Sequence, residues 1–209
     1  MWGAIRPWLF PVWCIGCGEP EIGLCGACAA SARSVEIVLE GVSVRAASEY
    51  EGAVRDAILA LKRGERAYLD PRARLVAPLV RPDTAIVPVT TTHRRAAERG
   101  FDQARELARR VAELRSGTLA DLLRKRGTAQ RGLGRDERLV ARGRFTLRPG
   151  VVLPPEVLLL DDVITTGATL RDAARVLAVA GCTVLGAVVV ARTPAGRETP
   201  RHGGRLVEA

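Results

Sequence analysis

The feature that most constrains this chain is a short apolar run that ends in two adjacent carboxylates and a turn of small residues. It reads Val157-Leu-Leu-Leu-Asp161-Asp162-Val163-Ile-Thr165-Thr166-Gly167-Ala168-Thr169. The run from Val157 to Leu160 is short and continuous, which is typical of a parallel strand buried on both faces. We therefore expect the carboxylates at its C-terminal end, the edge of an open α/β sheet where ligands bind.

The turn after the carboxylates consists of residues that let an anion approach the backbone closely. Thr165, Thr166, Gly167 and Thr169 are small, and they lie at the start of a predicted helix, whose N-terminus favours negative charge. The turn is thus expected to hold a phosphate, and the two carboxylates to face sugar hydroxyls. The alternative is a capped strand-to-helix turn without a ligand, although two unpaired acids at a buried strand end are costly unless something binds there.

Periodicity predicts an α/β fold around this stretch. Apolar residues recur at helical spacing from Leu170 to Ala180, and Thr183 to Ala191 read as a second buried strand. Upstream, a strand pair is expected within Glu36–Val44 and an amphipathic helix within Tyr50–Lys62. A strand over Ala85–Val89 and a helix capped by Asp102 complete the expected elements.

Four of the five cysteines form two close pairs near the N-terminus. They stand as Cys14-x-x-Cys17 and Cys25-x-x-Cys28, which is the spacing of a tetrahedral Cys₄ zinc site. A closed site of this kind is structural rather than catalytic. The alternative is a pair of disulfides, which we consider less compatible with the cytoplasmic location expected from the absence of a clear secretion signal. No apolar run approaches the roughly 20 residues that a membrane span needs.

The positive charge of the chain is concentrated in one segment. The net charge is +9, and Arg94 to Arg148 alone contain 16 basic and 7 acidic side chains. Only Lys62 and Lys125 are lysines, so that 30 of the 32 basic residues are arginine, which suits bidentate phosphate contacts. The segment is therefore expected to bind a polyanionic substrate or nucleic acid, with a solvated basic face as the alternative.

These pieces, in their order, resemble the ComF family of competence-associated, type I phosphoribosyltransferase-like proteins. The matching stretches are the Cys₄ module after Phe10-Pro11, the helix Tyr50–Lys62, Val87-Pro88-Val89 leading to Arg94-Arg95 and Arg99-Gly100-Phe101-Asp102, the segment Thr128–Phe145, and the acidic stretch described above. The resemblance implies an open parallel sheet flanked by helices, with a small N-terminal Cys₄ zinc module. It further implies binding of phosphoribosyl pyrophosphate (PRPP) together with Mg²⁺.

The resemblance also assigns roles to individual residues. It implies that Asp161 and Asp162 are the catalytic residues and contact the ribose hydroxyls, directly or through hydrated Mg²⁺, and that Thr165–Thr169 grip the 5′-phosphate. The pyrophosphate would be held by the basic side chains Arg94, Arg95, Arg99 and Lys62. The full PRPP-binding set is then Lys62, Arg94, Arg95, Arg99, Asp161, Asp162, Val163, Thr165, Thr166, Gly167, Ala168 and Thr169, and the metal ligands are Cys14, Cys17, Cys25 and Cys28.

The expected division of the chain is a Cys₄ module with linker strands over residues 1–45, a phosphoribosyltransferase-like domain over 46–192 and a flexible tail over 193–209. The family implies a part in handling incoming single-stranded DNA during natural transformation, with single-stranded DNA and competence-machinery proteins as candidate partners. Transfer of phosphoribosyl to an acceptor is left open, because no acceptor site is visible. The alternatives are a non-catalytic nucleic-acid-binding adaptor with a vestigial PRPP pocket and a nucleobase salvage enzyme.

Overall fold

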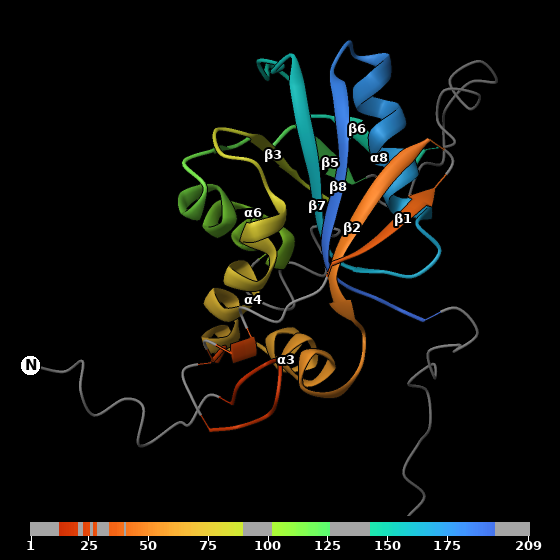
Figure 1. Ribbon diagram of the computed structural model, residues 1–209. Helices are drawn as coiled ribbons and strands as arrows, with labels where there is room; N and C mark the ends of the chain where they lie inside the picture. The colour runs from red at the N-terminus through yellow and green to blue at the C-terminus, as the bar shows by residue number, and fades with distance from the viewer. Residues whose placement is uncertain are drawn as a thin grey trace, which may run out of the picture.

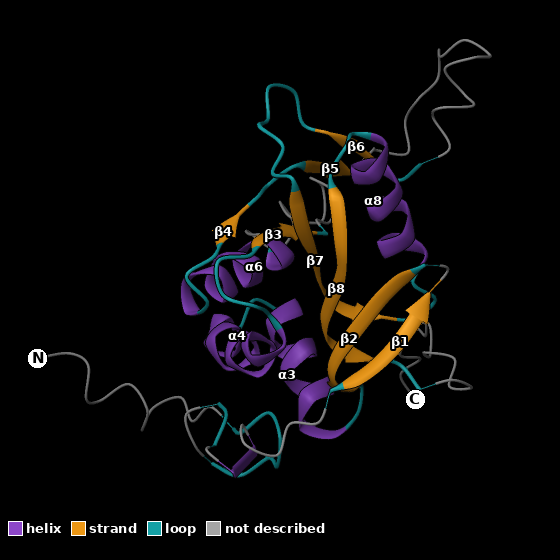
Figure 2. Ribbon diagram, turned by 45° about the horizontal axis from the view of Figure 1, so that its top comes forward, coloured by secondary structure: helices purple, strands orange, loops and turns teal. Residues whose placement is uncertain are grey.

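The fold is built on a six-stranded, mostly parallel sheet in the strand order β1-β2-β8-β7-β3-β4 (Figure 1; β4 is labelled in Figure 2). This computed structural model describes residues 13–20, 23–25, 27–28, 34–39, 41–89, 102–125 and 143–194. The strands of the sheet are β1 (Val35–Leu39), β2 (Val42–Glu49), β3 (Ala85–Pro88), β4 (Thr118–Leu119), β7 (Glu156–Ile164) and β8 (Thr183–Arg192). Strands β5 (Leu123–Lys125) and β6 (Phe145–Leu147) pair separately.

Helices cover both faces of this sheet (Figure 2). They are α3 (Gly52–Lys62), α4 (Leu69–Val76), α6 (Gln103–Leu114) and α8 (Ala168–Val179), with two 3₁₀ turns, η1 (Arg66–Tyr68) and η2 (Ala77–Leu79). Neighbouring strands from β2 to β4 run parallel, and only β1 pairs antiparallel with β2. The predicted α/β class, with an open sheet between helices, is confirmed. Among the described residues, no helix is both long and apolar enough to cross a bilayer.

Two apolar layers hold the helices on the sheet. Leu158 and Leu160 of β7 belong to a core shared with α3, α4 and α6, whereas Val157 and Leu159 face a core shared with α8, β5 and β6. All four side chains are at most 5% exposed. This alternation explains the continuous apolar run. Successive side chains of a central strand point to opposite faces of the sheet, and both faces are buried by helices.

Strand β7 is longer than the expected Val157–Leu160 and continues through both acids to Ile164. The neighbouring strand β8 supplies the reason, because its residues up to Arg192 pair with β7 as far as Ile164. Strand β3 has its last pairing with β7 at Pro88, opposite Leu160. The acids therefore lie in the part of β7 that extends beyond β3.

The expected strand pair around Gly41 is the hairpin of β1 and β2. Strand β2 runs from Val42 to Glu49 and pairs in parallel with β8, so it crosses the boundary expected at residue 45 and is part of the main sheet. The hairpin is joined to α3, which begins at Gly52, two residues after the expected start at Tyr50, and ends at Lys62 as predicted. Helix α6 begins after Asp102, whose side chain accepts a hydrogen bond from the backbone N–H of Arg105, as expected of a cap.

Candidate functional site

The acidic pair lies at the C-terminal edge of the sheet, where β7 extends beyond the end of β3. Asp161 pairs in the ladder with Val189 of β8, and both acids are only partly exposed, with 21% of the Asp162 side chain accessible. One oxygen of Asp161 accepts the backbone N–H of Asp162 at 2.7 Å. Likewise, Oδ1 of Asp162 accepts the N–H of Val163 at 2.7 Å. These contacts leave the second oxygen of Asp162, Oδ2, to face the adjoining helices.

Two cations from different helices approach that second oxygen. Nζ of Lys62, the last residue of α3, lies 3.6 Å from Oδ2 of Asp162. Nη2 of Arg72, in α4, lies 4.0 Å from the same oxygen. Burial disfavours the charged form of Asp162, but the charges of Lys62 and Arg72 outweigh it and lower the pKa of this carboxyl. Asp162 is therefore held as a carboxylate.

Asp161 behaves differently from its neighbour. Burial and the negative charge of Asp162 raise the pKa of Asp161 well above its usual value, and the positive charge of Lys125 in β5 counteracts this shift in part. The two adjacent carboxyls thus have pKa values shifted in opposite directions, as expected of a coupled pair, and a cation or a set of hydroxyl donors at the site would favour the charged form of Asp161.

The turn that follows the acids leads directly into helix α8. Thr165 and Thr166 are exposed, and Gly167 occupies the position before the helix with a φ of 71°. The first turn of α8 contains no acidic side chain, so its N–H groups and the positive end of its dipole face the solvent side of the turn without a competing carboxylate. This is the arrangement expected of a phosphate loop.

Gly167 is required by both its backbone and its surroundings. A Cβ at this position would lie 2.2 Å from Cδ1 of Leu39, a residue of β1 that packs beneath the turn. Leu39 of the β1–β2 hairpin thus limits the space available to this turn.

We expect Gly167→Ala to destabilise the protein by about 2–3 kcal/mol, since it adds a contact with Leu39 to the cost of left-handed backbone. Denaturant unfolding measures the change. Gly150→Ala is the matched control, because Gly150 has a φ of 69° with nothing within 4 Å of the added methyl group. Equal losses for the two variants would contradict the proposed contact with Leu39.

A further cation lies beside the start of α8. The guanidinium of Arg144 donates to Oγ1 of Thr169 at 3.4 Å. The following strand is tied to the same helix, because Asp172 accepts the backbone N–H groups of Arg144 and Phe145. Arg144 is exposed, so its charge is available near the N-terminal turn of α8.

The structure brings together part of the predicted PRPP-binding set. Lys62, the two acids and the turn from Val163 to Thr169 meet at one sheet edge. The predicted arginines Arg94, Arg95 and Arg99 lie outside the described residues, as does most of the stretch Thr128–Phe145. Their contact with pyrophosphate stays a prediction.

Sequence reasoning missed three cations that the structure places near the site: Arg72, Lys125 and Arg144. A signal for Lys125 existed, because it is one of only two lysines among 32 basic residues. Both lysines act on the acidic pair, Lys62 on Asp162 and Lys125 on Asp161. Arg72 carried no such signal, since it lies in a helix with other arginines and its burial is visible only in the fold.

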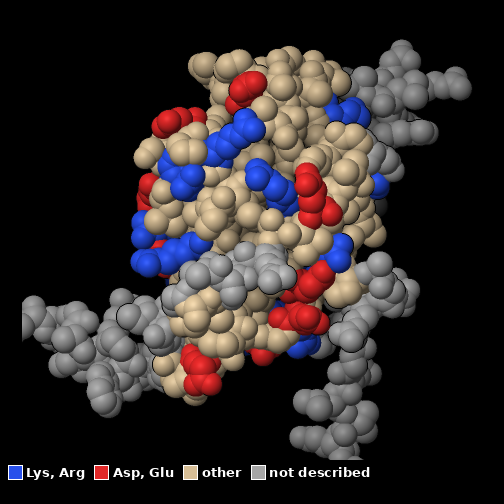
Figure 3. Space-filling view, viewed as in Figure 1, with Lys and Arg blue, Asp and Glu red and all other residues tan. Residues whose placement is uncertain are grey.

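Much of the described basic segment is neutralised by nearby acids. Arg105 and Arg148 both contact Asp121, at 3.0 and 3.1 Å. Arg110 pairs with Asp70 and Glu113, and Arg109 with Glu106 and Glu113. On the face shown in Figure 3, basic side chains likewise lie beside acidic ones. The described part of the segment is therefore a network of ion pairs rather than a uniform basic field.

The four N-terminal cysteines converge as the sequence predicts. The sulfur atoms of Cys14, Cys17, Cys25 and Cys28 all lie within 4.8 Å of one another. Backbone N–H groups point at these sulfurs, with Cys25 N–H donating to Sγ of Cys14 at 3.2 Å. A Cβ on Gly16 would lie 2.6 Å from Sγ of Cys28, so the loop closes around the cluster only with glycine there.

The chemistry of these thiols fits a bound cation. Burial opposes ionisation of Cys14, but hydrogen bonds from the backbone lower its pKa to about 6. A hydrogen bond with the Cys25 side chain, burial and the other cysteine sulfurs raise the pKa of Cys28, so the four closely spaced thiols are hard to ionise together. A divalent metal would remove that conflict by binding all four thiolates. The cluster can thus hold a structural metal.

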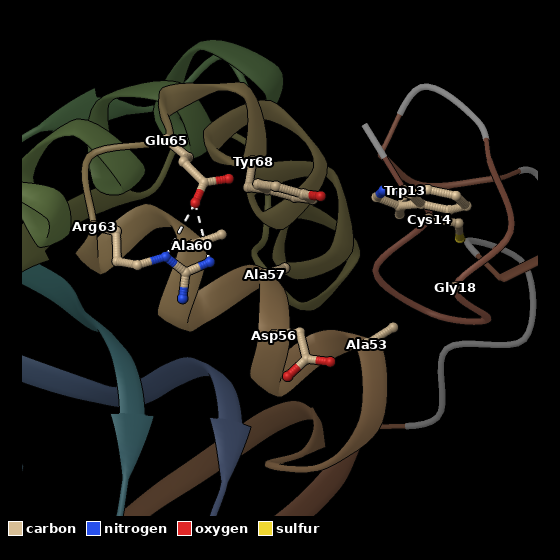
Figure 4. A pocket seen from close by; sticks show the side chains of 10 residues that line it. All are labelled: Trp13, Cys14, Gly18, Ala53, Asp56, Ala57, Ala60, Arg63, Glu65 and Tyr68. Carbon is tan, nitrogen blue, oxygen red and sulfur yellow. Dashed lines mark hydrogen bonds and ion pairs between the residues drawn. The ribbon is translucent and has the colours of Figure 1, made fainter. Parts of the chain in front are cut away.

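The cysteine module packs against the main domain through Ile15, and a cavity lies next to this contact. Ile15 is 1% exposed and belongs to the core of α3 and α4. Beside it, a cavity of about 430 Å³ lies between the cysteine loop and α3, with Trp13 and Tyr68 on its two sides and the Arg63–Glu65 ion pair at one end (Figure 4). The acidic pair does not line this cavity.

Comparisons with known proteins identify the domain that contains these residues. Residues 97–205, more than half of the chain, match the phosphoribosyl transferase domain. The chain is also 39% identical over 88 residues to Competence protein ComFC of Streptococcus pneumoniae. That alignment covers 42% of this chain and 38% of the length of the competence protein. The resemblance to the ComF family is therefore confirmed, and the acids, the turn and α8 all lie inside the matched domain. The chain belongs to the phosphoribosyl transferase domain family.

Proposed function

We propose that this protein binds PRPP with Mg²⁺ at the C-terminal edge of its sheet. One observation carries the proposal: the acidic pair at the end of β7 is followed at once by a glycine turn and the N-terminus of α8. The carboxylates suit ribose hydroxyls and a hydrated divalent cation, and the turn suits the 5′-phosphate. A ribose 5-phosphate would contact the carboxylates with its ribose hydroxyls and the turn before α8 with its 5′-phosphate.

The cations around the pair support a ligand with a second anionic group. Lys62 is 32% exposed and lies at the same carboxylate that would face the ribose, so its ammonium group can turn to the pyrophosphate. If the protein transfers phosphoribosyl, the bond between C1 and the pyrophosphate oxygen breaks, the bonding electrons leave with pyrophosphate, and a nucleophilic atom of the acceptor supplies the electron pair for the new bond to C1. Lys62 and the arginines at 94, 95 and 99 would then stabilise the charge that develops on the leaving group.

The cysteine cluster is proposed to hold Zn²⁺ in a purely structural role. All four sulfurs are occupied in a tetrahedral Cys₄ site, which leaves no open position for a substrate. We also infer a role in competence, supported by the similarity to Competence protein ComFC. Single-stranded DNA and other competence proteins are the corresponding candidate partners.

Calorimetric titration of the full chain with PRPP tests the proposal. We expect saturable binding in the presence of excess Mg²⁺ and at least about tenfold weaker binding with EDTA, because Mg²⁺ is bound through carboxylates and substrate phosphates together. Ribose 5-phosphate is the control ligand, because it keeps the hydroxyls and the 5′-phosphate but lacks the pyrophosphate. Absence of PRPP binding by the metal-replete wild type would refute the proposal, and release of pyrophosphate on addition of individual bases or amines would identify an acceptor.

A further inference from the structure

The most unusual side chain near the site is Arg72, which is buried without hydrogen-bond partners. It is 1% exposed and is among the largest fully buried side chains of the described residues. Its Nε, Nη1 and Nη2 atoms are all buried, and none has a hydrogen-bond partner among the described residues. A buried guanidinium in this state is costly, so its retention needs a physical reason.

The surroundings of Arg72 give that reason in electrostatic terms. It lies in α4, on the face that packs into the apolar core with Ala73 and Val76, and its Nη2 is 4.0 Å from Oδ2 of Asp162. Asp162 and Asp161 are also the charges that favour its protonated form against the effect of burial. The guanidinium of Arg72 is thus a positive charge that the core holds in place next to Asp162.

Arg72 shares its carboxylate oxygen with Lys62, but the two cations differ in freedom. The Lys62 side chain is 32% exposed and ends in a compact ammonium on a flexible stem, so it can leave Asp162 at little cost. The Arg72 side chain cannot leave, because the core encloses it. Any ligand that engages Oδ2 of Asp162 must displace Lys62, and Arg72 is then the only one of the two that remains.

We propose that Arg72 is a positioning residue that acts as the fixed counter-charge of Asp162, and that Lys62 is the exchangeable one, released to an anionic group of the ligand when Asp162 engages the ribose or its hydrated cation. This inference rests on the proposed PRPP site for the identity of the ligand. The pairing of Arg72 with Asp162 itself does not depend on it. The mechanism explains why one carboxylate has two cations while only one of them is accessible.

The pairing is tested by thermal unfolding of single and double variants, without any ligand. Asp162→Asn leaves the Arg72 charge without its nearest partner, and we expect it to lower Tm by about 5–10 °C. Adding Arg72→Met to Asp162→Asn is expected to restore most of that loss, because the uncompensated buried charge is removed as well. Adding Lys62→Met instead is expected to leave the low Tm unchanged, since the exposed ammonium is solvated.

The positioning role is tested by PRPP titration with Mg²⁺. Arg72→Met is expected to weaken binding by at least about tenfold, and Arg72→Lys to recover affinity to within about threefold of wild type, because a charge rather than a bidentate contact is required. Arg74→Met is the matched control on the same helix, since Arg74 is exposed and pairs with Asp70. It is expected to leave affinity unchanged.

The possible results separate this inference from the proposed function. If Arg72→Met changes Tm equally with aspartate and with asparagine at position 162, the two residues are not coupled and the inference is overturned, whether or not PRPP binds. If PRPP binds equally well to wild type and to folded Arg72→Met, the positioning role is overturned while the proposed function stands. If the coupling is present but wild type does not bind PRPP, the proposed function fails and the counter-charge pairing stands.

Discussion

Asp162→Asn is expected to reduce Mg²⁺-dependent PRPP binding by at least about 100-fold, the largest effect of any single change in this chain. The substitution removes the carboxylate whose low pKa keeps it charged, and the neutral amide that replaces it attracts a cation much less strongly. It also leaves Lys62 and Arg72 facing a neutral group, so the site becomes repulsive for Mg²⁺. Calorimetric titration measures the affinity.

Asp83→Asn is the matched control, because Asp83 is an exposed acid just before β3, at the opposite edge of the sheet. The Asp83→Asn variant has the same chemical change as Asp162→Asn at a position away from the site, and it should bind PRPP with wild-type affinity. Retention of wild-type affinity by Asp162→Asn would exclude Asp162 from the site. If the competence role is correct, the Asp162→Asn gene should also fail to restore transformation in a naturally transformable strain that lacks the wild-type gene.

The sequence predicted the elements that local patterns encode. Apolar periodicity located β7, α8 and β8, since a doubly buried strand and an amphipathic helix leave distinct patterns in the chain. The acids and the glycine turn were assigned to one site because they are adjacent in sequence. The cysteine spacing predicted a four-sulfur cluster for the same reason, and the structure confirms it.

The end of β7 was not predicted correctly, because strand length depends on neighbours. Asp161 and Asp162 are poor strand formers, and the sequence pattern favours a strand that stops before them. Their strand geometry comes from β8, which continues alongside to Arg192 and supplies the missing ladder partners. Each of these partners lies 28 residues away in sequence, so no local pattern predicts the pairing.

The cations of the site illustrate the same limit. Lys62 could be singled out because it ends a helix, whereas Arg72 resembles any other arginine of a charged helix until the fold buries it. Likewise, an excess of arginine predicted a polyanion-binding segment, but Asp70, Asp121 and Glu113 neutralise several of these arginines. Ion pairs between separate helices and strands depend on the tertiary structure, so they cannot be predicted from the number of charged residues in a segment.

Loss of the metal from the cysteine cluster is the second large effect that we expect. The wild-type protein should contain about one Zn²⁺ per chain, as the closed four-thiolate site requires, and Cys25→Ser should lose it. Without the metal, the four sulfurs lose the ion that would link the two halves of the loop around Gly16. Metal analysis of the purified protein measures the first effect.

The consequence extends into the main domain through Ile15. This side chain is 1% exposed in the core of α3 and α4. If loss of the metal lets Ile15 leave the core, the free energy of unfolding should fall by about 2 kcal/mol and Tm by about 5 °C.

Cys182→Ser is the control for Cys25→Ser. Cys182 is buried next to β8, far along the chain from the cluster, so its substitution should leave the zinc content unchanged. A protein that contains no zinc and instead has two disulfides among the four cysteines would contradict this prediction. Because Ile15 joins the metal loop to the helix that ends in Lys62, the metal would then support the PRPP site indirectly, by fixing the helix from which that ammonium reaches Asp162.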